Sequence, residues 1–166
     1  RYTSSKKIIN KYAWITSGVI FITPLPGLDF LATSIINIQM VIEISNVYAV
    51  NLTKEKAVEL TKSIVKVLAT LGVVKGGMNM FTNLLSTNFT TRFITKSVQS
   101  ITAAWIIRIV GLAFIQYFQK NQSWGDSGIR ETVQNLYEIN KREEILKDFL
   151  KEALKKINLK DNSLKK

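Results

Sequence analysis

The longest apolar stretch of the chain, residues 12–42, contains a single charged residue and is interrupted near its middle by a helix-breaking sequence. The interruption consists of two prolines, a glycine and an aspartate: Pro24, Pro26, Gly27 and Asp29. Proline has no amide donor and clashes with the preceding helical turn, so a helix that enters this sequence ends there. Glycine permits a tight reversal, and an aspartate can accept hydrogen bonds from the first amides of a following helix. The pattern therefore predicts an apolar helical hairpin over residues 8–50.

Helical spacing of apolar residues recurs along the rest of the chain, whereas strict alternation is scarce. A break is expected at the glycine pair Gly76-Gly77. The further segments predicted are an amphipathic helix at 53–75, a long apolar helix at 92–120, soluble amphipathic helices at 127–159 and a basic tail at 160–166. The predicted fold is therefore all-α, with residues 1–166 forming one membrane-associated helical bundle.

The net charge of +11 raises nucleic acid or an anionic membrane as partners. Most of the excess flanks the apolar segments, with four positive charges in residues 1–11 and four in residues 67–119, where no acidic residue occurs. This distribution favours a membrane surface. A specific nucleic-acid binder is not expected, because the C-terminal helix mixes both signs and the chain has five arginines against eighteen lysines. A basic RNA- or ribosome-associated module stays as an alternative.

Each arm of the predicted hairpin is short for a membrane span, since 16 residues rise by about 24 Å against a hydrocarbon core of about 30 Å. The hairpin either dips into or barely spans a bilayer, or its arms are buried in a soluble bundle; we favour the membrane. Residues 97–119 are long enough to span, with Arg108 as their only charge. A lone arginine in mid-membrane needs a partner, and Asp29 is the candidate. Alternatively, Asp29 only caps a helix and Arg108 lies on a solvated edge.

Basic and aromatic residues near the ends of the apolar segments are candidates for a membrane interface, where lysines extend to the headgroups and aromatic rings gather. These candidates are Lys6, Lys7, Lys11, Trp14, Trp105 and Tyr117. Packing in a protein core is an equally ordinary explanation for the aromatic residues.

The sequence offers no catalytic site. Cysteine and histidine are absent, which excludes zinc fingers and Cys/His nucleophiles from this stretch. The glycine cluster at residues 72–77 lacks the Ser/Thr and the preceding strand of a phosphate-binding loop. Glu143-Glu144 lies on a highly charged helix, which favours a solvated face over a catalytic pair. We therefore predict no enzyme activity, no cofactor, no metal and no small-molecule substrate.

Four stretches carry a resemblance to a known family: KYAWITSGVIFITPLPGLDFLATSIINIQMVIEISNVYAV, ELTKSIVKVLATLGVVKGG, SITAAWIIRIVGLAFIQYF and QSWGDSGIRETVQ. Their order and spacing over residues 11–159 resemble the YcjF-like domain of unknown function. That domain follows the GTPase module of certain cyanobacterial and plastid Era/Der-like GTPases and also occurs in a bacterial inner-membrane protein. The resemblance implies a membrane-associated domain and supplies no catalytic residue.

The resemblance and a composition rich in Ile, Lys and Asn, which have A/T-rich codons, imply a plastid-encoded or low-GC cyanobacterial protein. The expected function is a non-catalytic module, peripheral or shallowly inserted in the thylakoid membrane. It would anchor or connect larger, photosynthetic membrane complexes, with lipids and their subunits as partners. The alternative is the membrane anchor or regulatory arm of a GTPase whose nucleotide-binding domain lies upstream.

Overall fold

The computed structural model describes residues 1–22, 30–86 and 91–164. Within these residues the chain forms seven helices and no strand, which confirms the predicted all-α bundle. The helices are α1 (Tyr2–Ile22), α2 (Phe30–Val47), α3 (Lys54–Leu71), α4 (Val73–Leu85), α5 (Thr91–Gln119), α6 (Gly128–Asn140) and α7 (Glu143–Leu164). The interrupting residues Pro24, Pro26, Gly27 and Asp29 lie outside the described residues, so their predicted roles stay predictions.

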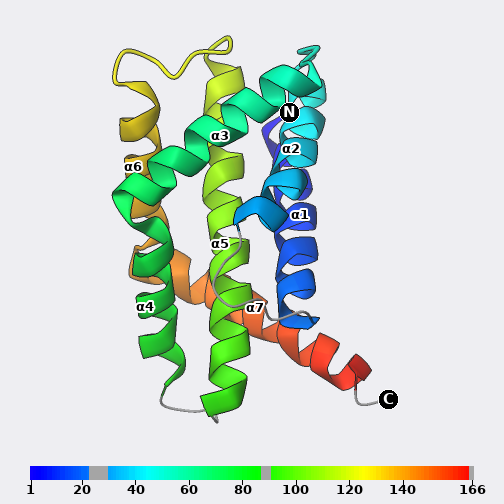
Figure 1. The fold of residues 1–166 in the computed structure, drawn as a ribbon, viewed down its shortest axis with the longest axis vertical. Helices are drawn as coiled ribbons and strands as arrows, with labels where there is room; N and C mark the ends of the chain where they lie inside the picture. The colour runs from blue at the N-terminus through cyan, green and yellow to red at the C-terminus, as the bar shows by residue number, and fades with distance from the viewer. Residues whose placement is uncertain (23–29, 87–90, 165–166) are drawn as a thin grey trace.

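Helix α5 runs through the middle of the bundle, with α1 and α2 on one side and α4 and α6 on the other (Figure 1). Helix α3 crosses between the two sides in the upper half of the view, and α7 runs obliquely across the lower half (Figure 1). The most extensive packing joins α1 to α5. There, a Cβ atom on Gly111 would lie 2.4 Å from Cγ1 of Ile9. Only a residue without a side chain permits this approach of the two helices.

The predicted break at Gly76-Gly77 is wrong, because α4 continues through both glycines. The chain turns instead at Gly72, whose φ of 67° lies in the left-handed region and whose amide donates to the last turn of α3. The glycine pair serves close packing. A Cβ at Gly77 would lie 2.9 Å from the ring of Trp105, and one at Gly76 would overlap the hydroxyl of Tyr137.

Two further boundaries differ from the predicted ones. Helix α1 begins at Tyr2, six residues before the predicted start, because buried Ser5 and Ile9 continue its packed face into the basic N-terminal segment. Helix α7 extends to Leu164, so most of the segment predicted as a basic tail is helical.

One segment among the described residues, Ser97–Gln119 of α5, is long and apolar enough to cross a membrane. However, 83% of its most apolar 18-residue segment is buried inside the bundle. A helix that is apolar on all sides suits a protein core as well as it suits lipid. Two of the interface candidates, Trp105 and Tyr117, are only 1% and 5% exposed and lie in the core, which agrees with the alternative explanation that such aromatic residues pack in a protein core.

Candidate membrane-interface site

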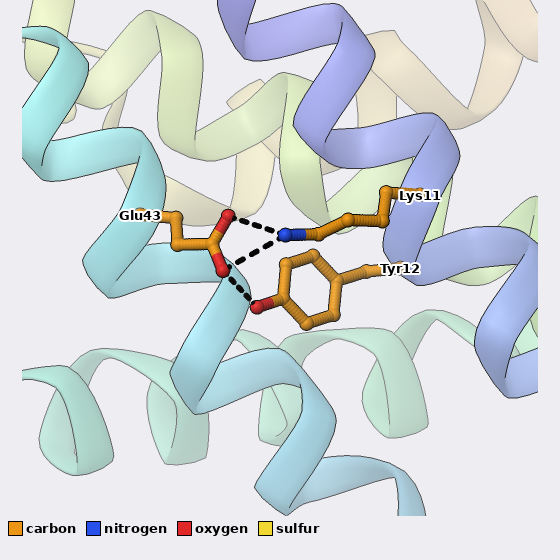
Figure 2. Close-up of polar contacts among 3 residues, drawn as sticks. All are labelled: Lys11, Tyr12 and Glu43. Atoms are coloured by element: carbon orange, nitrogen blue, oxygen red, sulfur yellow. Dashed lines mark hydrogen bonds and ion pairs between the residues drawn. The ribbon is translucent and has the colours of Figure 1, made fainter.

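A polar cluster joins α1 to α2 at the point where the charged part of the hairpin ends (Figure 2). The ammonium group of Lys11 donates to both carboxylate oxygens of Glu43, at 2.8 and 3.0 Å. The hydroxyl of Tyr12 donates to the same carboxylate, and the Lys11 ammonium lies 4.6 Å from the centre of the Tyr12 ring. We refer to Lys11, Tyr12 and Glu43 as the boundary cluster. It holds the two arms of the hairpin together across 32 positions of sequence.

The electrostatics of the boundary cluster favour its charged form. Burial acts to raise the pKa of Glu43, but the hydrogen bonds from Lys11 and Tyr12 outweigh it, so that pKa lies below its ordinary value. The hydrogen bond to Glu43 raises the pKa of Lys11. Burial and the bond to Glu43 raise the pKa of Tyr12. The side chains of Lys11 and Glu43 remain 51% and 38% exposed, so water screens their attraction.

These shifts predict a small pH dependence of stability. Because the pKa of Glu43 is lower in the folded state, its stabilisation is complete above its ordinary value of 4.5 and is lost as the pH falls through the folded value. The pKa values of Lys11 and Tyr12 are higher in the folded state, so their stabilisation is lost as the pH rises above about 10. We expect Glu43→Gln to lower the melting temperature by about 1 °C at pH 7 and by less at pH 3. Thermal scans from pH 3 to 7 test this, and a larger deficit at pH 3 than at pH 7 would contradict it.

The boundary cluster separates two chemically different halves of the hairpin. On the N-terminal side, α1 carries half-buried Lys6 and exposed Lys7 before Lys11. On the other side, residues 12–42 contain no charge except Asp29. Ile15, one turn beyond the cluster, is 47% exposed. Lysine and tyrosine are the residues that mark such a transition at membrane surfaces.

The interface candidate Trp14 lies just inside the apolar half and is half-buried. Its ring stacks on Phe149 of α7, with centroids 5.7 Å apart and planes inclined by 15°. This contact ties α7 to the apolar half of α1.

Arg108 is half-buried on α5, and its guanidinium carbon lies 5.8 Å from the centre of the Phe149 ring on α7. This geometry is a cation–π contact. The predicted partner Asp29 lies outside the described residues, so their ion pair stays a prediction.

Sequence reasoning missed both Phe149 and Glu43 as partners. For Glu43 a signal existed, since it is the first acidic residue after the apolar stretch.

The helix interfaces of the hairpin and α5 bury many small polar side chains. They are Ser5, Thr16, Ser17, Asn37, Ser45, Ser97, Ser100 and Thr102. Small and hydroxyl-bearing residues let helices approach closely, and membrane helix pairs are enriched in them. Together with the contact at Gly111, these side chains allow close packing of the hairpin on α5.

No curated protein and no solved structure matches the chain. A family model described as a domain of unknown function (DUF697) matches residues 1–142, which include α1 to α6. Helix α7 begins directly after the matched region and completes the core with Phe149, which is 3% exposed. Since the match covers most of the sequence, the chain belongs to the DUF697 family of domains of unknown function.

Proposed function

We propose that this chain is a non-catalytic, membrane-associated helical module that inserts the apolar half of the α1–α2 hairpin into one leaflet of a bilayer. The observation that carries the proposal is the position of the boundary cluster. It joins both arms at the same level. From the cluster, α1 continues without charge forward to Ile22, and α2 is without charge back to its first residue, Phe30. On α1 this division places a basic segment at the level of the headgroups and an apolar segment at the level of the acyl chains.

The dimensions favour shallow insertion. Residues 12–22, which complete α1 beyond Lys11, rise by about 16 Å, roughly half of the ~30 Å hydrocarbon core. Helix α5, although long enough to span, is covered by its neighbours in the bundle. Residues 12–22 are therefore long enough to reach through about one leaflet.

The finer assignment follows from the sequence resemblance. It supports a thylakoid location and a role as anchor or connector between larger, photosynthetic complexes. The same resemblance supports the second candidate, the membrane arm of a GTPase with its nucleotide-binding domain upstream. Reading the complete gene for a phosphate-binding loop separates these two roles, because the membrane-binding module is common to both.

The experiment that tests membrane insertion compares two introduced charges on α1. Ile15→Glu places a carboxylate beyond the boundary cluster, and Ser4→Glu places one before it; both positions are exposed. They lie 11 residues apart, which is about three helical turns, so they share one face of the helix. We expect Ile15→Glu to weaken binding to neutral phosphatidylcholine vesicles by about tenfold or more, because an apolar contact with lipid is replaced by a charge.

Flotation on a density gradient measures the bound fraction of each variant. Ser4→Glu is expected to bind neutral vesicles like the unmodified chain. Equal binding by all three proteins, or the absence of any flotation, would overturn the proposal. Because both positions are exposed, neither substitution is expected to change the melting temperature by more than about 2 °C, and this control excludes loss of binding through unfolding.

A further inference from the structure

A cavity of about 300 Å³ lies between four helices on the charged side of the boundary cluster. Its lining includes Tyr2 and Lys6 from α1, Arg108 and Gln116 from α5, and Asn140 at the end of α6. Aliphatic side chains from α5, α6 and the first turn of α7 complete the wall. The volume is at the lower end of the range for sites that hold small molecules.

The charged groups that line this cavity are all positive. Lys6 and Arg108 both line it, and no carboxylate does so among the described residues. The ion pairs between described residues are formed by Lys11, Lys56, Lys141 and Lys147, and they include neither of these two cations. Two half-buried cations at one cavity therefore produce a local positive potential with no acidic side chain in its wall.

Each cation lies near an aromatic ring. The Lys6 ammonium lies 5.6 Å from the centre of the Tyr2 ring, and the Arg108 guanidinium lies against Phe149. The ring beside Arg108 is 3% exposed and restricts that side chain, whereas Tyr2 is 49% exposed and restricts Lys6 less. Asn140 is fixed as well, because its amide donates to the carbonyl of Leu136 at 2.7 Å.

We propose that this cavity binds a phosphate group through Lys6 and Arg108, with the amide of Gln116 as a further donor. The planar guanidinium donates two parallel hydrogen bonds to phosphate oxygens, and the ammonium adds a second positive charge. The aliphatic wall accommodates the organic part of the ligand. The phosphate belongs either to a free phosphomonoester or to the headgroup of an anionic lipid, and both share this recognition chemistry.

In the first arm of the test, the full chain is titrated with glycerol 3-phosphate in lipid-free buffer. In the second arm, binding to phosphatidylglycerol vesicles is compared with binding to phosphatidylcholine vesicles. Lys6→Gln and Arg108→Gln are each expected to weaken phosphate binding by about tenfold or more. The matched control is Lys7→Gln, which removes an exposed charge beside Lys6 that does not line the cavity. We expect this control to bind within about twofold of the unmodified chain.

Arg108 also packs on Phe149, so Arg108→Gln could lose binding because the chain unfolds. A second pair of variants separates these two causes. Gln116→Glu adds a negative charge to the cavity wall and is expected to abolish phosphate binding, while Gln134→Glu adds the same charge on the exposed face of α6. Loss of glycerol 3-phosphate binding in the cavity variants supports a free phosphate ligand. Loss confined to phosphatidylglycerol vesicles supports a lipid headgroup. If Lys7→Gln is affected equally, or if the cavity variants bind as the unmodified chain does, the proposal is wrong.

This inference does not rest on the proposed insertion of the hairpin. The insertion test uses neutral vesicles and Ile15, whereas the first arm here contains no lipid. Either proposal can therefore fail while the other holds.

Discussion

Trp105→Ala is expected to lower the free energy of unfolding by about 4 kcal/mol, the largest loss for any single substitution considered. The indole is 1% exposed and meets two rings edge-on, with centroid distances of 5.7 Å to Phe81 and 5.6 Å to Tyr137. Its N–H donates to the backbone carbonyl of Asn140 at 3.4 Å. One side chain thereby joins α4, α5 and α6, and its removal leaves a cavity that these helices cannot close.

Urea unfolding followed by far-UV circular dichroism measures this loss. The control is Trp124→Ala, since Trp124 is half-buried at the edge of the core and its removal is expected to cost less. Trp105→Phe keeps an aromatic ring and is expected to fall between the unmodified chain and the alanine variant. A stability change below about 1 kcal/mol for Trp105→Ala, combined with weaker vesicle binding, would instead restore Trp105 as an interface residue.

The second large effect is expected at the contact between α1 and α5. Gly111→Val introduces a branched side chain where even a Cβ atom would lie 2.4 Å from Ile9. The two helices must separate or Ile9 must leave its rotamer, at an expected cost of about 3 kcal/mol. Because α1 carries the boundary cluster, the same variant is expected to bind neutral vesicles more weakly.

A double-mutant cycle identifies the cause of this loss. Ile9→Ala alone also destabilises, because it removes a side chain that is 2% exposed. Combined with Gly111→Val, it makes room for the new methyl groups, so the double variant is expected to be at least about 1 kcal/mol more stable than the sum of the two single changes. If the losses of the two single variants simply add in the double variant, the close contact between Gly111 and Ile9 is not the cause of the loss. Valine has a higher helix propensity than glycine, so propensity alone predicts a small stabilisation at Gly111 and cannot cause the expected loss.

Helix existence was largely predictable, because apolar periodicity and capping chemistry are local properties of the chain. Thr53 directly precedes α3, and its hydroxyl accepts a hydrogen bond from the amide of Lys56 at 3.2 Å, which is the arrangement typical of a helix N-cap. The break between α3 and α4 was not predictable to the same degree. Glycine serves both turns and close packing, and only the positions of Trp105 and Tyr137 distinguish Gly76 and Gly77 from Gly72.

The candidate site was predictable only in part. Lys11 was recognised from its place at the edge of an apolar stretch. Glu43 lies at the other edge, 32 positions away, and its pairing with Lys11 depends on how α1 and α2 pack. Arg108 was recognised as an isolated charge in an apolar helix. Its contact with Phe149 and its shared cavity with Lys6 depend on how α1, α5 and α7 cross, which a pattern along one helix does not encode.

The sequence by itself therefore determined the all-α class, the approximate places of the helices and the apolar stretch of residues 12–42 with basic residues before it. These properties follow from side-chain chemistry read along one chain. Only the tertiary structure decided what surrounds each apolar residue. An isoleucine in α5 avoids water equally well against lipid or against another helix, so its hydrophobicity cannot distinguish the two. The burial of Ser97–Gln119 shows that in this protein its neighbours are helices of the same bundle.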